Sequence, residues 1–168
     1  MNSVYLITGA CGCGKSTLSK KLMYELEHSI LITGDELHGF FGDKREISWP
    51  ERLRITWENI ISVTQNSLRN RLNVIIDYVV EDELPLLLEG LKEFEYDLRY
   101  MVLDAGEESI RSRITKRGDV GQIERALFLR EKLRKEHLNQ PYLYDNSDKT
   151  VEDEMNAIMY DIRYRYIK

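Results

Sequence analysis

Short apolar runs alternate along the chain with longer segments in which apolar residues recur at the spacing of a helix. The short runs have the length and composition of strands, and the pattern predicts them at about 3–8, 29–33, 73–77, 96–103 and 141–144. The longer segments predict helices at about 14–27, 82–93, 107–116 and 121–138, a long helix from Pro50, and a last helix along 151–162.

Strands that alternate with helices predict an α/β fold in which a parallel sheet is covered on both faces. The run at 73–77 is continuously apolar, as expected for a strand that is buried on both sides. A chain of 168 residues without an internal repeat or linker is expected to form one domain, residues 1–168. Because ligands bind at the carboxyl ends of the strands in such sheets, the residues after each strand are the candidates for chemistry.

The segment after the first predicted strand, residues 9–16, reads Gly-Ala-Cys-Gly-Cys-Gly-Lys-Ser, the complete pattern of a phosphate-binding loop. Its glycines let successive backbone N–H groups point inward at phosphate oxygens, and the following helix adds the positive end of its dipole. Lys15 is expected to reach the β- and γ-phosphates, and the Ser16 hydroxyl is expected to ligate Mg²⁺. The nucleotide contacts predicted here are Gly9, Cys11, Gly12, Cys13, Gly14, Lys15, Ser16 and Thr17.

Carboxylates follow most of the predicted strands. Asp35, after the second strand, is the candidate general base for an acceptor hydroxyl; the alternative is that it caps a short helix that begins at Glu36. His38 could face the same cleft and contact the substrate, or it could be a surface or capping residue. Asp77, at the end of the third strand, is expected to hold the Mg²⁺ shell or the substrate, the alternative being an ordinary strand-end residue.

Two arginines four residues apart, Arg113 and Arg117, precede a segment that contains Gly118 and Gly121. Such a segment can act as a mobile lid at about 112–126, and an arginine that it carries can neutralise charge on a transferring phosphoryl group and exclude water. The alternative is a solvated helix face, which is the usual meaning of a run of charges.

The composition of the chain indicates which binding partners and which cellular compartment to expect. The net charge of −5 and the pI of about 5.3 do not suggest nucleic acid or an anionic membrane as a partner. No apolar run approaches the length of a membrane span, and the N-terminus lacks a signal-peptide pattern, so we expect a cytoplasmic protein. We expect it to be a monomer or a homodimer. The cysteines, Cys11 and Cys13, are too few for a disulfide framework, but a helix N-terminus lowers thiol pKa and could make them reactive.

Four motifs together resemble the nucleoside-monophosphate-kinase-like group of phosphate-loop kinases: GACGCGKST, TGDELH after the second strand, VIIDYVV on the third, and Arg113-x-x-x-Arg117-Gly118-Asp119. GDELH is similar to a segment of gluconate kinases, and VIIDYVV followed by an acidic residue is similar to chloramphenicol phosphotransferase. The resemblance implies a five-stranded parallel sheet in the order 2-3-1-4-5, a small lid, and ATP with Mg²⁺ as the phosphoryl donor.

The resemblance also implies roles for individual residues. Asp35 matches the carboxylate that activates the acceptor hydroxyl. Arg113 matches a lid-hinge arginine that stacks on adenine, and Arg117 matches a lid arginine that contacts phosphates. Asn146 and Ser147 fall where such kinases hold the adenine through main-chain contacts.

One departure bears on the acceptor. True nucleotide kinases usually supply an arginine after the third strand for the acceptor's phosphate, but residues 78–83 here are acidic, and Arg45, Arg52 and Arg54 could substitute only in part. We therefore expect an ATP-dependent kinase for a hydroxyl of a small molecule, such as a sugar acid, nucleoside or antibiotic. The alternatives are a nucleoside or nucleotide kinase and a nucleotide-binding regulatory ATPase.

Overall fold

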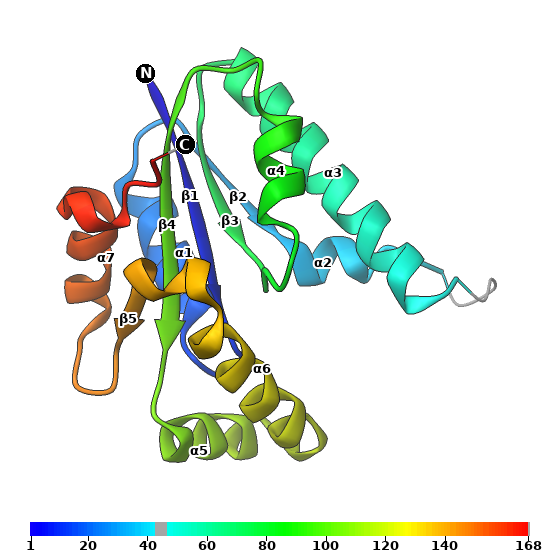
Figure 1. Ribbon diagram of the computed structural model, residues 1–168, viewed down its shortest axis with the longest axis vertical. Helices are drawn as coiled ribbons and strands as arrows, with labels where there is room; N and C mark the ends of the chain where they lie inside the picture. Colours follow the sequence, from blue (N-terminus) through cyan, green and yellow to red (C-terminus); the bar gives the residue numbers. More distant parts are fainter. Residues whose placement is uncertain (43–46, 168) are drawn as a thin grey trace.

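One parallel sheet is built from five strands, β1 (Asn2–Gly9), β2 (Ser29–Thr33), β3 (Asn73–Asp77), β4 (Tyr96–Asp104) and β5 (Leu143–Asp145). In the computed structural model, which describes residues 1–42 and 47–167, their order is β2-β3-β1-β4-β5 (Figure 1). Every neighbouring pair is parallel. The predicted fold class and strand order are therefore confirmed.

The helices that connect the strands are α1 (Lys15–Glu25), α2 (Gly34–His38), α3 (Trp49–Arg69), α4 (Leu84–Gly90), α5 (Glu107–Arg117) and α6 (Ile123–Lys135), and α7 (Val151–Tyr160) follows the last strand. Three short 3-10 helices lie at Val120–Gln122, His137–Tyr142 and Ile162–Tyr164. Two of these 3-10 helices shift predicted boundaries. The 3-10 helix Val120–Gln122 delays the start of α6, and the 3-10 helix His137–Tyr142 delays the start of β5. The pattern of apolar residues cannot distinguish a 3-10 turn from the end of an α-helix or strand.

Alternate residues of the strands face two separate cores. Val4 and Leu6 of β1 pack with side chains of α3 and α4, whereas Tyr5 and Ile7 pack with side chains of α1, α5, α6 and α7. Figure 1 shows the corresponding arrangement, with α3 and α4 on one side of the sheet and α1 and α7 on the other. Each large apolar side chain buried in this way contributes about 1.5–3 kcal/mol to the stability of the folded state. The two cores together hold the sheet in place as a rigid platform.

The packing brings the carboxyl ends of β2 and β3 close together. Gly34, the first residue of α2, has no side chain to separate the two segments. A Cβ atom at this position would lie 2.2 Å from ring atoms of Tyr78, the residue that follows β3. The glycine therefore permits the close approach that sets Asp35 beside the β3 end of the sheet.

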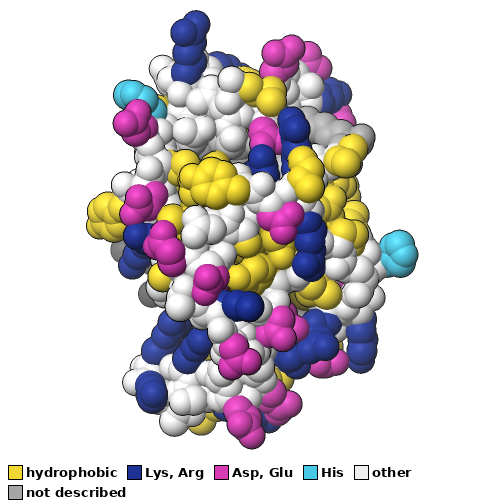
Figure 2. Space-filling view, turned by 90° about the vertical axis from the view of Figure 1, so that its left-hand side faces the viewer, with side chains coloured by type: hydrophobic (Ala, Val, Ile, Leu, Met, Phe, Trp, Pro, Cys, Tyr) yellow, Lys and Arg dark blue, Asp and Glu magenta, His cyan; other side chains and the backbone are white. Residues whose placement is uncertain are grey.

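The surface carries mixed charge. Figure 2 shows acidic and basic side chains interspersed over the face on which α7 lies, with hydrophobic side chains between them. Within residues 1–42 and 47–167, none of the helices combines the length and the apolar character that a membrane span requires.

Candidate functional site

The predicted phosphate loop joins β1 to the N-terminus of α1. Gly12 and Gly14 have φ values of 81° and 113°. These values lie in a region that favours glycine, and they allow the loop to curve tightly. Lys15 is only 9% exposed, and its Nζ atom donates hydrogen bonds to the carbonyl oxygens of Gly9, at 2.9 Å, and Ala10, at 3.2 Å. The ammonium group is thus held inside the loop, where an incoming phosphate can replace the carbonyls as its partner.

Two side chains hold the outer surface of this loop. Nη1 of Arg113, on α5, donates to the carbonyl oxygens of Gly12 at 3.1 Å and Cys13 at 3.2 Å. Nδ2 of Asn146 donates to the same Cys13 oxygen at 2.8 Å and to Oε1 of Glu154 at 2.7 Å. With these carbonyls bound on the outside, the loop keeps a conformation suited to anion binding.

These contacts bear on two roles that the resemblance implies. Arg113 and Asn146 support the loop directly, and their proposed contacts with adenine remain predictions. Ser147 lies next to Asn146 in an exposed turn, in which its N–H and hydroxyl both donate to Oδ1 of Asp145, at 3.0 and 2.6 Å. Its main-chain contact with adenine is likewise a prediction.

Asp77 lies at the end of β3 with 4% of its surface exposed. Burial raises the pKa of its carboxyl, while the Lys15 charge and a hydrogen bond with the Ser16 side chain oppose the rise. A carboxylate and a hydroxyl therefore meet beside the phosphate loop, and both are oxygen ligands of the kind that Mg²⁺ prefers. Within the described residues, no group of three or more His, Cys, Asp or Glu side chains is placed to hold a metal ion.

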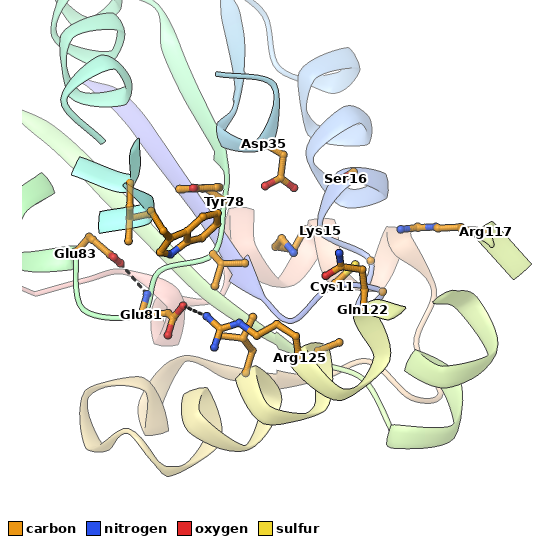
Figure 3. Close-up of a pocket in the computed structure, with 17 residues that line it drawn as sticks. Cys11, Lys15, Ser16, Asp35, Tyr78, Glu81, Glu83, Arg117, Gln122 and Arg125 are labelled. Atoms are coloured by element: carbon orange, nitrogen blue, oxygen red, sulfur yellow. Dashed lines mark hydrogen bonds and ion pairs between the residues drawn. The ribbon is translucent and has the colours of Figure 1, made fainter. Parts of the chain in front are cut away.

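A cavity of about 360 Å³ opens above the loop (Figure 3). Seven predicted residues line it together, although they come from three separate parts of the sequence: Cys11, Gly12, Gly14, Lys15, Ser16, Asp35 and Arg117. The remaining lining is formed by Trp49, Leu53, Tyr78, Val79, Glu81, Glu83, Gln122, Arg125, Ala126 and Leu129. The predicted residues outside this lining are Gly9, Cys13, Thr17, His38, Asp77, Arg113, Asn146 and Ser147.

Asp35 is exposed on α2, and its carboxylate points toward Lys15 (Figure 3). The N-cap of α2 is Thr33, so the alternative of Asp35 as a helix cap does not hold. His38 is half-buried at the other end of α2, with Nδ1 3.4 Å from Oγ1 of Thr56 and its ring 4.8 Å from that of Trp49. The structure thus places His38 behind the cavity wall, and a direct contact with substrate remains a prediction.

The predicted lid folds as a compact turn. α5 ends at Arg117, its C-cap Gly118 has a φ of 82°, and the chain then continues through the 3-10 helix into α6. Arg117, Gln122 and Arg125 from this segment line the cavity. Ion pairs connect α6 to the segment after β3, from Arg125 to Glu81 at 2.6 Å and from Lys132 to Glu81 at 3.1 Å.

Sequence reasoning did not find the aromatic and apolar wall formed by Trp49, Leu53, Tyr78 and Leu129. Tyr78 could have been found, because it directly follows Asp77 at the carboxyl end of a strand. Trp49 and Leu129 carry no such signal, because each lies in a helix whose approach to the cavity depends on tertiary packing.

The expected reactivity of both cysteines is wrong for Cys13. Its side chain is 1% exposed, and burial raises the pKa of the thiol despite the nearby Lys15 charge. Desolvation therefore outweighs the stabilisation of a thiolate that the helix N-terminus was expected to provide. Cys11 is half-buried and lines the cavity.

Comparisons with known proteins identify the family and the fold of this chain. The AAA domain family matches residues 4–140 of the sequence. The fold is similar to a sugar kinase from Janibacter sp. HTCC2649, with a TM-score of 0.68, 14% identity, and 98% of this chain and 96% of that chain covered. It is also similar to the Mycobacterium tuberculosis APS kinase CysC in complex with AMPPNP and APS, with a TM-score of 0.66, 14% identity, and coverage of 94% and 95%.

A further similar chain belongs to the structure of the Pnkp1/Rnl/Hen1 RNA repair complex, with a TM-score of 0.62 and 22% identity over 77% of this chain. The present chain spans only 44% of the length of that one. No curated protein matches the sequence. At these identities the likenesses establish the fold of phosphate-loop kinases, in agreement with the resemblance found in the sequence.

Proposed function

We propose that this chain, which belongs to the AAA domain family, is an ATP-dependent kinase that phosphorylates a hydroxyl group of a small molecule. The observation that carries the proposal is the meeting of Lys15, Asp35 and Arg117 around one cavity. This set combines a phosphate-binding cation, a carboxylate for the acceptor proton and a second cation at the edge of the site, which are the parts that phosphoryl transfer needs.

In the proposed reaction, the loop N–H groups and Lys15 hold the β- and γ-phosphates of ATP in place. Asp35 accepts the proton of the acceptor hydroxyl as the oxygen forms its bond to the γ-phosphorus. The bond between that phosphorus and the β,γ-bridging oxygen breaks, and ADP leaves with the electron pair. Ser16 and Asp77 would hold Mg²⁺, which when bound offsets charge on the phosphates.

Arg117 completes the proposed site from the lid. Its side chain is exposed at the edge of the cavity, and Figure 3 shows it on the side of Lys15 opposite to Tyr78. A modest closure of the segment would bring the guanidinium toward the phosphates and exclude water, so that the acceptor and not water receives the phosphoryl group.

The test is acceptor-dependent formation of ADP from MgATP, measured with a panel of sugars, sugar acids, nucleosides and antibiotics. The proposal expects ADP formation to rise well above background with at least one acceptor and to fall by about 10²-fold or more in Lys15→Ala. Lys21→Ala is a matched control, because Lys21 lies on the same helix in an exposed ion pair with Glu25. Steady ATP hydrolysis that no acceptor stimulates would instead support a regulatory ATPase and would overturn the kinase assignment.

A further inference from the structure

The part of the cavity beyond the phosphate loop is lined mainly by apolar and aromatic side chains. Trp49 and Leu53 come from the first turns of α3, Tyr78 and Val79 follow β3, and Leu129 comes from α6. Trp49 is 59% exposed although it lines the cavity. Such a surface is suited to contact with an apolar or aromatic body rather than with a hydroxyl-rich chain.

Packing behind this wall fixes its rings in place. The ring of Tyr78 lies 5.5 Å from that of Trp57, which is fully buried, and it also abuts Gly34. The ring of His38 lies 4.8 Å from the Trp49 indole. A ligand ring would therefore meet surfaces that are already ordered, and little conformational entropy would be lost on binding.

The charges on the same side are mostly negative. Asp35, Glu81 and Glu83 line the cavity there, and Oε2 of Glu83 is held by the N–H groups of Glu81 at 2.8 Å and Asp82 at 3.0 Å. Burial and these carboxylates raise the pKa of Tyr78 to about 12, so its phenol stays neutral and can donate a hydrogen bond.

Three cations near this wall are paired with carboxylates. Arg125 and Lys132 bind Glu81, as described above. Of the arginines considered for an acceptor phosphate, Arg54 pairs with Glu58 at 2.5 Å, and Nε of Arg52 donates to the Ile47 carbonyl at 3.2 Å. Arg45 lies outside the described residues. The cavity lining on this side thus carries the carboxylates of Asp35, Glu81 and Glu83, which disfavour an anionic acceptor, and neither Arg52 nor Arg54 belongs to that lining.

Building on the proposed kinase function, we infer that the acceptor is an uncharged or cationic alcohol that carries an aromatic ring, and that the ring packs against Trp49 and Tyr78. The hydroxyl would then point toward Asp35 and the phosphate loop. Among the acceptors considered from the sequence, this favours nucleosides and aromatic antibiotics over sugar acids and nucleoside monophosphates.

Binding is tested first, independently of turnover. Trp57 is fully buried, so a change in tryptophan emission on ligand binding that is lost in Trp49→Phe reports on Trp49. We expect nucleosides and phenyl-bearing amino alcohols to change this emission in the presence of MgADP, and gluconate and nucleoside monophosphates to leave it unchanged. The reverse ranking, or no response to any aromatic alcohol, would overturn the inference even if the chain proves to be a kinase.

Kinetics then separate the inference from the proposed function. Trp49→Ala should raise KM for an aromatic acceptor about tenfold with a smaller change in kcat, and Trp49→Phe should restore most of the loss. Tyr160→Ala removes an aromatic side chain that is 73% exposed on α7, outside the cavity, and should change neither constant. Unchanged KM in Trp49→Ala, or phosphorylation of gluconate in preference to every aromatic alcohol, would overturn the inference alone. Ring binding without any ADP formation would overturn the proposed function alone.

Discussion

The two halves of the cavity are built differently. On the donor side, Lys15, Asp77 and Asn146 are each less than a tenth exposed, and the loop carbonyls of Gly12 and Cys13 are held by hydrogen bonds. On the acceptor side, Asp35 is exposed and Trp49 presents more than half of its surface to solvent.

This difference has a physical reason. In the proposed reaction, the donor phosphates have the same shape and charge whatever the acceptor, so a preorganised loop can stabilise the transferring group without reorganisation. On the acceptor side of the proposed reaction, the side chains lie in contact with solvent and beside the segment that we propose to act as a lid. We therefore expect changes on the two sides to affect different steps of the reaction.

Asp35→Asn should give the largest loss specific to the acceptor side. Removing the proton acceptor while keeping the shape of the side chain should lower turnover by about 10²–10⁴-fold, with ATP affinity close to normal. Steady-state kinetics and calorimetric ATP binding measure the two quantities, and Glu36→Gln, at the next position on α2, is the control. Loss of ATP binding in Asp35→Asn would mean that the residue belongs to the donor side.

Lys15→Ala should damage the donor side by about 10²–10³-fold in turnover, because a preorganised charge beside the transferring phosphoryl group is lost. Its effect should be independent of which acceptor is used, in contrast to that of Trp49→Ala. Turnover near that of the wild type would contradict the role of the loop, provided that thermal unfolding shows the variant to be folded.

Arg117→Ala should have a smaller effect, roughly tenfold in turnover, with less change in ATP affinity, because the exposed guanidinium acts mainly as charge redistributes during transfer. Amide exchange of residues 115–124 should be fast in the free protein and should slow when nucleotide and acceptor are bound together. If this segment is already protected in the free protein and does not change, Arg113 and Arg117 belong to a static helix face.

The smallest expected effect concerns the two cysteines. Because burial raises the pKa of the Cys13 thiol, it stays protonated in mildly alkaline buffer and should be alkylated at least about tenfold more slowly than Cys11. MgATP should protect Cys11, which lines the cavity. Tandem mass spectrometry of the loop peptide distinguishes the sites, and preferential labelling of Cys13 would mean that the loop opens in solution.

The donor side was largely predictable from the sequence, because its chemistry depends on glycines, one lysine and one serine at fixed spacing. The strand order followed from the resemblance, and Asp35 was located by its place after a strand. The acceptor wall was not predictable, because Trp49 and Leu129 lie in helices far apart in the sequence and meet only through tertiary packing. The burial of Cys13 was missed because local sequence indicates a helix N-terminus but not the residues packed over it.

The most direct test of the central claim is to follow the phosphoryl group itself. The acceptor recovered after incubation with MgATP would be analysed by mass spectrometry, and ADP would be measured in the same sample. The account predicts one phosphorylated acceptor molecule for each ADP formed by the wild-type protein, and neither product above background in Lys15→Ala. Release of inorganic phosphate in equal amount to ADP, with the acceptor unchanged, would contradict it.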